Sequence, residues 1–330
     1  MKTASGTQET TILVGTEAGG LFRRSPGQDE WQEITVGLPE TPEIRGLVAH
    51  PSKSGLVFAG TQIAPYKSRD NGVHWQRLEI PSEVVVWCYA FQPGNPDIMF
   101  LGTGTSDVYR SENCGDSWEK ISTIINPDAP SMPFQMRILD LSVNPSTPDE
   151  MYAALEVGGV ARSSDAGYTW EPINNGLAPE IDRLDLHGVA TTENRVFISN
   201  REGVWRSNNR GDTWENLHLE NFSPIHYSRG VLVAPNNPTT LYACAGGSFQ
   251  SSEGGILRSV DLGNTWSRFD QGALGNSTTF GVSIDRANPN HIFFCTRDGQ
   301  VIGTEDDGAT WNEFPLPESV RDVISILVVS

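Results

Sequence analysis

Short apolar runs, each closed by a turn, recur along the chain and predict an all-β protein. The runs are rich in β-branched and aromatic residues, and four of them are followed by a proline two residues later; they are residues 45–49, 87–91, 137–143, 184–190, 229–233 and 280–284. Such residues favour strands, and proline ends strand pairing. No stretch carries the apolar period of a long helix. We therefore expect several antiparallel sheets, each with one apolar inner strand.

A turn motif recurs between these runs, with the pattern Ser/Thr-x-Asp/Asn-x-Gly-x-Ser/Thr-Trp. It is complete at Ser111–Trp118, Ser163–Trp170, Ser207–Trp214, Ser259–Trp266 and Thr304–Trp311, has His74 in the hydroxyl position at Ser68–Trp75, and is degenerate at Phe22–Trp31. Successive copies place their tryptophans 43 to 52 residues apart, the length of one four-stranded propeller blade. Seven copies predict a seven-bladed β-propeller, with residues 1–330 as a single domain and residues 1–9 disordered.

The motif has the chemistry of a tight hairpin tip. A short carboxylate or carboxamide accepts backbone N–H groups of its own turn, glycine permits a positive φ, and the tryptophan begins the next strand. Repetition once per blade favours a structural role over metal or acid sites for Asp70, Asn113, Asp165, Asn209, Asp261 and Asp306. With this motif the whole chain resembles the Asp-box (BNR-repeat) β-propeller superfamily, which includes sialidases, xyloglucanases, the sortilin ectodomain and a photosystem II assembly factor. The resemblance implies the fold, whereas function depends on the site.

The two ends of the chain are expected to complete one blade together. The first blade has strands only at residues 10–14, 20–24 and 31–35, so it lacks an innermost strand. Residues 320–329 match the inner strands elsewhere, such as residues 44–49. We predict that the C-terminal strand joins blade one and closes the ring, because closure leaves no open sheet edge.

Two blades are longer than the others, and their extra residues fall in loops of one face. The first insertion covers roughly residues 121–135, ahead of the inner strand of blade four. The second covers residues 245–255, between the middle strands of blade six. Both loop types emerge on the same side of an up-and-down blade, so both should surround one mouth of the central channel. Inserted loops commonly carry function.

The residues that begin each inner strand should line this mouth. The candidates for acid–base catalysis are His187, His226 and Tyr227. Substrate contacts are expected from Arg45, Trp87, Arg137, Asp140, Glu156, Asp185, Arg229 and Arg321. Clustered arginines suit a carboxylate, phosphate or sulfonate, although the same arginines could instead pair with acids of the channel wall. The histidines could likewise be hydrogen-bonded strand residues.

The sialidase branch of the resemblance implies a specific set of catalytic residues. An arginine trio would be Arg45, Arg229 and Arg321, and a nucleophilic pair would be Tyr227 with Glu156 or Glu17. Two departures oppose this assignment, because sialidases have six blades and their Arg-Ile-Pro signature is missing here. Xyloglucanases join two propellers across a cleft, whereas this chain supplies one. We therefore do not expect a sialidase.

Composition limits the partners and the compartment. The chain carries a formal charge of −18, which argues against nucleic acid and anionic membranes as partners. No apolar segment is long enough to span a membrane and no apolar signal core stands at the start, so we expect a cytoplasmic protein. The four cysteines, Cys88, Cys114, Cys244 and Cys295, lack metal-ligand spacing and are expected to be free thiols. His50 and His74 are interpreted as turn residues.

Two classes of function remain. The first is an enzyme of hydrolase, lyase or isomerase type that binds a small anionic or sugar-like substrate at this mouth, with His187, His226 or Tyr227 transferring a proton. The second is a non-catalytic scaffold or assembly factor that binds a protein partner there. A metal-dependent enzyme using the two histidines with Asp140 or Asp185 is a further alternative. We predict the first class, with no metal site assigned and the cofactor left open.

Overall fold

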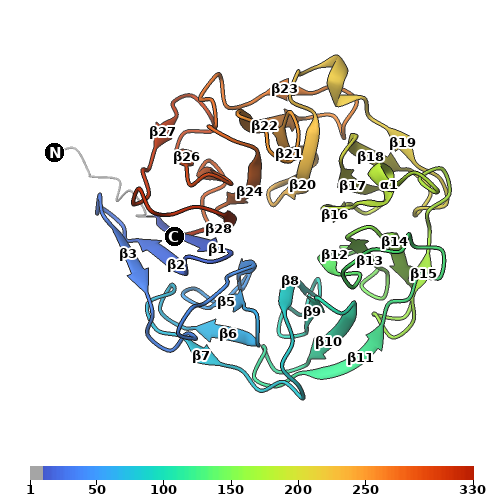
Figure 1. The fold of residues 1–330 in the computed structure, drawn as a ribbon, viewed down its shortest axis with the longest axis horizontal. Helices are drawn as coiled ribbons and strands as arrows, with labels where there is room; N and C mark the ends of the chain where they lie inside the picture. Colours follow the sequence, from blue (N-terminus) through green and yellow to red (C-terminus); the bar gives the residue numbers. More distant parts are fainter. Residues whose placement is uncertain (1–9) are drawn as a thin grey trace.

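The computed structural model describes residues 10–330, in which seven four-stranded antiparallel sheets form a closed ring (Figure 1). The predicted all-β seven-bladed propeller is confirmed. The expected disorder of residues 1–9 lies outside the described residues. Two single turns of helix, α1 (Ile181–Leu184) and a 3-10 turn (Leu219–Asn221), lie in loops between blades. Within the described part of the chain, no helix has the length and apolar character needed to cross a membrane.

Each blade runs outward from an inner strand to an edge strand. Blade one is β28 (Val323–Val329), β1 (Thr11–Thr16), β2 (Leu21–Arg24) and β3 (Trp31–Ile34). Blades two to four are β4–β7 (Gly46–Ala49, Val57–Gly60, Pro65–Ser68, Gln76–Arg77), β8–β11 (Val86–Phe91, Met99–Thr103, Asp107–Ser111, Glu119–Thr123) and β12–β15 (Ile138–Val143, Met151–Leu155, Gly159–Ser163, Glu171–Pro172). Blades five to seven are β16–β19 (Gly188–Thr191, Val196–Asn200, Gly203–Ser207, Glu215–Asn216), β20–β23 (Tyr227–Ala234, Asn237–Gly246, Gly254–Ser259, Ser267–Arg268) and β24–β27 (Thr279–Ile284, Ile292–Thr296, Val301–Thr304, Asn312–Glu313).

The C-terminal strand closes the ring, as predicted. β28 pairs antiparallel with β1, from the Thr11–Val329 pair to the Gly15–Ser325 pair, and so forms the inner strand of blade one. It also packs against the inner strands of both neighbouring blades, β24 and β4. The first and last segments of the chain therefore share one sheet and one apolar cluster, which removes the open edge.

The motif turns are held by a repeated set of hydrogen bonds. In six of them the first hydroxyl accepts the glycine N–H at 2.8 or 2.9 Å. The Asp or Asn Oδ1 accepts the N–H four residues onward at 2.8 to 3.0 Å. Burial alone would raise the pKa of Asp70, but the hydrogen bonds from His74 and Ser68 hold it at about 2. These groups are committed to their own turns, as expected for hairpin tips.

A cationic side chain ahead of most motif turns ties its blade to the next one. Arg162 Nη1, for example, donates to the Arg210 carbonyl oxygen at 2.8 Å across the junction of blades four and five. The other contacts of this kind join Arg23 to Asn71, Lys67 to Asp116, Arg110 to Tyr168, Arg206 to Leu262 and Arg258 to Asp307. Gly303 holds this position in blade seven, where a Cβ would lie 2.2 Å from Phe293. The junction of blades seven and one is instead joined by β28, by the Thr10–His291 hydrogen bond and by Arg24 over the Phe314 ring.

One predicted strand was wrong at its start. Residues 184–190 were expected to form the inner strand of blade five, but Leu184 ends α1 and β16 begins only at Gly188. The Leu184 N–H donates to the Glu180 carbonyl at 3.0 Å, and the Asp185 N–H donates to the Ile181 carbonyl at 2.9 Å, which closes a helical turn. The two insertions fall in the expected connections, as loops 124–137 and 247–253, but residues 121–123 belong to β11, residues 245–246 to β21 and residues 254–255 to β22.

Candidate functional site

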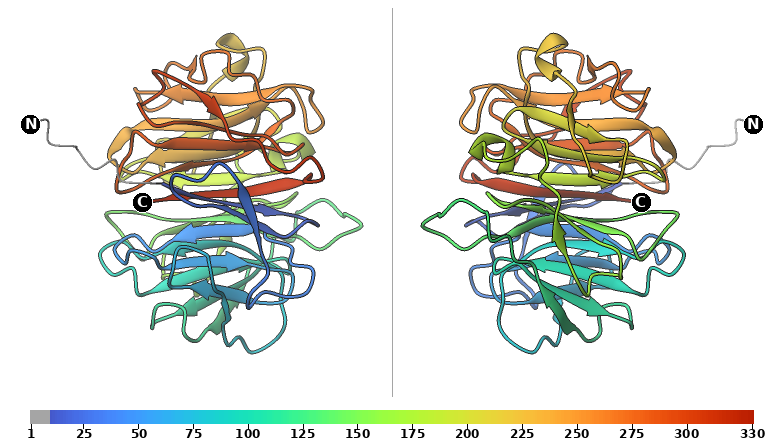
Figure 2. Two further views of the ribbon diagram at one scale, coloured as in Figure 1. Left: turned by 90° about the vertical axis from the view of Figure 1, so that its left-hand side faces the viewer. Right: turned by 90° about the vertical axis from the view of Figure 1, so that its right-hand side faces the viewer.

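The two inserted loops lie on the face where each inner strand begins. Loop 124–137 enters β12, and loop 247–253 joins β21 to β22. Successive strands of an up-and-down blade reverse direction, so both connections leave their blades at the same end. The green segment of the first loop projects from one side of the disc in both views of Figure 2. We call the channel opening on this side the long-loop mouth.

The first inserted loop places Phe134 on a column of arginine and aromatic side chains. The Arg137 guanidinium carbon lies 4.7 Å from the Phe134 ring centroid and 5.4 Å from that of Trp87. Arg45 of blade two approaches the same Trp87 ring at 4.3 Å. Cation–π contacts of this kind hold an aromatic ring in place at a surface. Two acids pair with Arg45: Glu17 at 3.1 Å and Glu43 at 2.6 Å.

The second inserted loop forms a matching group on the other side of the ring. Phe249 is 43% exposed, and its ring centroid lies 5.9 Å from that of Phe280. Arg229 lies 4.6 Å from the Phe280 centroid, and Arg297 lies 4.5 Å from that of Phe249. Arg297 also pairs with Asp322 at 3.3 Å, whereas the Arg229 guanidinium makes no ion pair among the described residues. Arg229 is thus a cation left available to a ligand.

Backbone bulges aim three of these side chains. The register between the first two strands of a blade shifts at Trp87 in β8, at Arg229 in β20 and at Phe280 in β24. A bulge leaves one residue outside the pairing ladder and redirects its side chain. All three side chains are half-buried at the long-loop mouth. The sequence analysis missed Phe134, Phe249 and Phe280, although an aromatic residue in each inserted loop was a usable signal.

Two carboxyl groups at this mouth have pKa values shifted in opposite directions. Glu156 follows β13, and its Oε2 lies 3.0 Å from Arg137 Nη1. Burial raises the pKa of Glu156, against the Arg137 charge, and the neighbouring Asp185 carboxylate raises it further. Burial alone would also raise the pKa of Asp185, but His187 and Arg201 bring it down to about 2, with Arg201 Nε at 2.7 Å. Pairs of carboxyl groups with pKa values pushed apart suit distinct acid and base roles.

His187 and Tyr227 are packed into the wall behind these carboxylates. The His187 side chain is buried, its Nδ1 lies 2.7 Å from the Ser228 carbonyl oxygen, and its ring centroid is 5.4 Å from that of Tyr227. Burial lowers the pKa of His187, and the Arg229 charge lowers it further. Burial also raises the pKa of Tyr227. His187 Nε2 lies 3.5 Å from Asp185 Oδ2 and makes no hydrogen bond among the described residues, so Arg201 is the group that orients the Asp185 carboxylate.

The remaining predicted residues lie apart from this group. His226 is half-buried, and its Nδ1 has no hydrogen-bond partner among the described residues. Arg321 is exposed, and its Nη1 donates to the carbonyl oxygen of the adjacent Val320 at 2.6 Å. Asp140 lines the central channel below the mouth. The structure thus brings together Arg45, Trp87, Arg137, Glu156, Asp185, His187, Tyr227 and Arg229 and leaves Arg321 and Asp140 outside.

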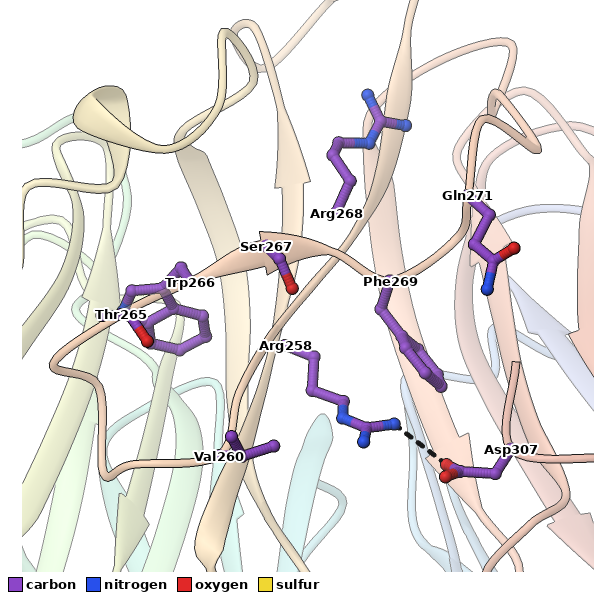
Figure 3. A pocket seen from close by; sticks show the side chains of 9 residues that line it. All are labelled: Arg258, Val260, Thr265, Trp266, Ser267, Arg268, Phe269, Gln271 and Asp307. Carbon is purple, nitrogen blue, oxygen red and sulfur yellow. Dashed lines mark hydrogen bonds and ion pairs between the residues drawn. The ribbon is translucent and has the colours of Figure 1, made fainter. Parts of the chain in front are cut away.

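Hollows also lie away from the long-loop mouth. The central channel contains a cavity of about 790 Å³ that opens on the face opposite the long-loop mouth, where His50, Lys53 and Ser330 line it. A second hollow of about 490 Å³ lies at the outer rim between blades six and seven (Figure 3). In it Arg258 points to Asp307, 3.0 Å away. This rim hollow belongs to the contact that joins the two blades.

Comparison with known proteins finds two groups of similar sequences. No family model matches it. The chain is 21% identical over 335 residues to an oligoxyloglucan-reducing end-specific xyloglucanase of Emericella nidulans, covering 82% of this chain and 40% of the enzyme. It is 24% identical over 236 residues to sortilin of Rattus norvegicus, covering 67% of this chain and 26% of sortilin. The chain spans less than half the length of these relatives.

Solved structures show the same fold. A xyloglucanase from Xanthomonas campestris superposes with a TM-score of 0.68 at 15% identity, over 98% of this chain and 52% of that one. The protein YCF48 bound to a D1 peptide superposes with a TM-score of 0.54 at 17% identity, over 84% of each chain. The protein is therefore a seven-bladed propeller similar to those of xyloglucanases and sortilin, as the repeats predict.

Proposed function

We propose that the protein is a carbohydrate-acting hydrolase whose glycan substrate binds at the long-loop mouth. The observation that carries the proposal is the pair of carboxyl groups, Glu156 with a raised pKa and Asp185 with a pKa of about 2, beside arginine-stacked aromatic rings. Aromatic rings offer flat apolar surface to the C–H face of a sugar, and arginines offer hydrogen bonds to its hydroxyl groups. The similarity to xyloglucanases supports glycans as the substrate class.

The two carboxyl groups suit different steps of glycoside hydrolysis. A protonated Glu156 would donate its proton to the glycosidic oxygen as the C–O bond breaks. Water would then add to the anomeric carbon, and the Glu156 carboxylate would take the proton that this water loses. Asp185 stays ionised at almost any pH, which makes it a weak base and suits it to stabilise the positive charge that develops on the sugar. Arg137 holds Glu156 in place, and Arg201 holds Asp185. The rate should fall as pH rises through the raised pKa of Glu156, because the acid loses its proton.

The test is hydrolysis of xyloglucan oligosaccharides, followed by the release of reducing ends. We expect Glu156→Gln to lower turnover by about 10²- to 10⁴-fold, the usual contribution of a general acid. Oligosaccharide affinity, measured by calorimetry, should stay within a few-fold of the parent protein. Glu202→Gln is the matched control, because Glu202 also lies in a loop of this face and pairs with Arg183 at 3.1 Å. Unchanged turnover in Glu156→Gln, or no glycan binding by the parent protein, would refute the proposal.

A second candidate function is a scaffold that captures a peptide at the same mouth. The structure of YCF48 bound to a D1 peptide matches this chain over 84% of each chain, so the match covers most of both proteins. The exposed Phe249 and the unpaired Arg229 would suit a peptide with aromatic and acidic residues. Fluorescently labelled acidic peptides separate the two functions. Peptide binding that is lost in Phe249→Ala, together with no response to glycans, would favour the scaffold.

A further inference from the structure

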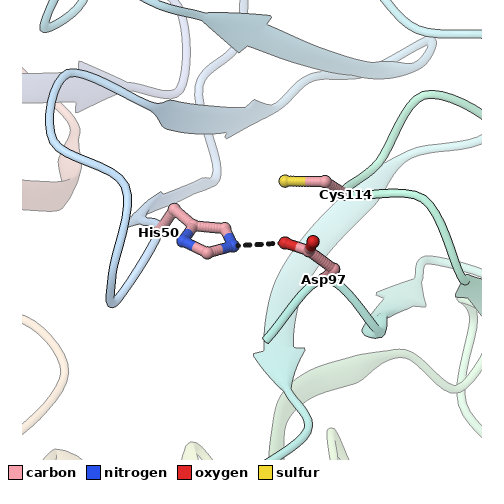
Figure 4. A group of neighbouring side chains, drawn as sticks. All are labelled: His50, Asp97 and Cys114. Carbon is pink, nitrogen blue, oxygen red and sulfur yellow. Dashed lines mark hydrogen bonds and ion pairs between the residues drawn. The ribbon is translucent and has the colours of Figure 1, made fainter. Parts of the chain in front are cut away.

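Three different kinds of metal ligand meet on the face opposite the long-loop mouth. His50 lies in the turn between β4 and β5, Asp97 in the turn between β8 and β9, and Cys114 in the motif turn between β10 and β11. One ligand atom from each residue lies within 4.8 Å of the other two. Figure 4 shows the three side chains pointing toward one another across the junction of blades two and three.

Backbone contacts and packing fix these side chains. The Cys114 N–H donates to the Asp97 carbonyl oxygen at 2.8 Å, so the two residues are tied together through their main chains. The His50 side chain is fully buried, and its ring packs edge-on against Phe91 at 5.5 Å between centroids. His50 Nε2 lies 3.2 Å from Asp97 Oδ1. The three ligand atoms are therefore held close together before any ion arrives.

The donor set matches a borderline divalent cation. Zn²⁺ binds imidazole nitrogen, thiolate sulfur and carboxylate oxygen at about 2.0 to 2.3 Å, which puts tetrahedral donors about 3.3 to 3.8 Å apart. Donor separations that are already within 4.8 Å need to shorten by at most about 1.5 Å. We propose that His50, Asp97 and Cys114 form a Zn²⁺ site at the junction of blades two and three. Three protein ligands leave the fourth position to water.

The Lys53 ammonium group competes with a metal ion for the Asp97 carboxylate. Its Nζ lies 2.5 Å from Asp97 Oδ1, so an ammonium group already neutralises the carboxylate. The Lys53 side chain is 45% exposed and can swing into solvent when a metal replaces it. Removing the Lys53 charge should therefore strengthen metal binding, whereas it would only weaken a purely structural cluster of hydrogen bonds.

Metal binding also moves two protons. The Ser52 N–H donates to His50 Nδ1 at 3.2 Å, so the ring carries its proton on Nε2, toward Asp97. A metal at Nε2 requires that proton to move to Nδ1, which breaks the bond from the Ser52 N–H and lets the new Nδ1–H donate to the Ser52 hydroxyl oxygen, 3.5 Å away. The Cys114 thiol loses its proton to solvent as the sulfur–metal bond forms. Binding should therefore release one proton per ion and weaken as pH falls.

The next blade junction supplies a matched control. There the Ala166 N–H donates to the Asp149 carbonyl oxygen at 2.8 Å, in the same way that Cys114 contacts Asp97. Gln92 occupies the position that His50 has in blade two. The Gln92 N–H donates to the Ile98 carbonyl oxygen, just as the His50 N–H donates to the Leu56 carbonyl oxygen. This junction keeps the carboxylate and lacks the imidazole and the thiol. Asp149→Asn therefore tests whether any acid on this face matters.

Co²⁺ is the probe, because a thiolate–Co²⁺ bond absorbs in the near ultraviolet. We expect one Co²⁺ per chain with this band, displaced by Zn²⁺, and at least tenfold weaker binding in His50→Gln and Asp97→Asn. Cys114→Ser should abolish the band, since the other three cysteines are buried. Lys53→Met should tighten binding, and Asp149→Asn should leave it unchanged. Circular dichroism confirms that each variant is folded.

Several outcomes would overturn the site. The proposal fails if neither the parent protein nor Lys53→Met binds Co²⁺ saturably at one ion per chain. It also fails if the near-ultraviolet band survives Cys114→Ser, or if Asp149→Asn weakens binding as much as Asp97→Asn does. Each result concerns the face opposite the long-loop mouth and is independent of glycan binding.

Discussion

Replacing Asp140 by asparagine should stabilise the protein at neutral and alkaline pH. Asp140 in β12 accepts the N–H of Val189 in β16 at 3.0 Å and the N–H of Leu141 at 2.9 Å, and so joins the inner strands of blades four and five. Both donors are neutral backbone N–H groups, and burial raises the pKa of Asp140 to about 7. Asparagine has nearly the same shape, keeps one oxygen acceptor and carries no charge.

The size and sign of the effect follow from this pKa. A rise from 3.8 in the unfolded chain to about 7 in the folded chain is worth about 1.4 kcal/mol per unit, or about 4 kcal/mol when the group is ionised. Partial exposure to the channel and one lost hydrogen bond reduce the gain, so we expect about 1 to 3 kcal/mol. Because the folded protein binds the extra proton, stability falls as pH rises from about 4 to about 7.

Urea unfolding of both proteins from about pH 4 to about pH 9 measures this difference. The stability advantage of Asp140→Asn should be near zero at the acidic end and reach a plateau above about pH 7. Asp185→Asn is the opposite control, because the folded pKa of Asp185 is about 2. Its carboxylate stabilises the fold at neutral pH, and this contribution is lost as pH falls through the folded pKa. A constant difference for Asp140→Asn, or destabilisation at every pH, would refute the reasoning.

Two other perturbations test the ring and its mouth. Deletion of residues 323–330 removes the whole of β28 and should abolish cooperative unfolding in calorimetry, because blade one loses its inner strand and exposes an edge. Arg229→Ala should weaken ligand binding in calorimetric titrations, whereas Arg321→Ala should leave it unchanged, since Arg321 is exposed and its only hydrogen bond among the described residues is to the adjacent carbonyl. Equal losses in both variants would show that the mouth extends to Arg321.

The fold could be predicted because its rules are local and repeated. In each motif turn, side chains of the turn accept hydrogen bonds from its own backbone N–H groups. Seven copies of the motif therefore predict seven hairpins without reference to the rest of the fold. Blade one lacked an inner strand and the C terminus had one apolar strand without a blade. Pairing the two was the only arrangement that completed seven blades. The helical turn at Ile181–Leu184 was missed, because four residues are too few to show a helical period.

The site was predictable only as a region. Inner-strand positions told which arginines would stand near the mouth, but bulges at Trp87 and Arg229 decide where side chains point, and these register shifts have no signature in the repeats. His50 and Cys114 were interpreted one at a time, as a turn residue and a free thiol. Their meeting with Asp97 depends on how blade two packs on blade three, across 47 residues of chain between His50 and Asp97.

Because the blades repeat, the cluster of His50, Asp97 and Cys114 can be built again at the next blade junction. At the junction of blades three and four, Asp149 already stands where Asp97 does, and Ala166 has φ of 57°, close to the 58° of Cys114. Gln92→His and Ala166→Cys together should therefore create a second Co²⁺ site, giving two ions per chain. No lysine competes there, because Asn95 replaces Lys53 in the turn.

Each single substitution is the control for this double variant and should leave one ion per chain, because two protein ligands hold Co²⁺ too weakly. The second ion should show the near-ultraviolet band even when Cys114→Ser removes the first site. If the double variant still binds one ion while its fold is intact by circular dichroism, equivalent backbone positions do not suffice. The buried packing of His50 against Phe91 would then be the feature that makes the natural site bind a metal.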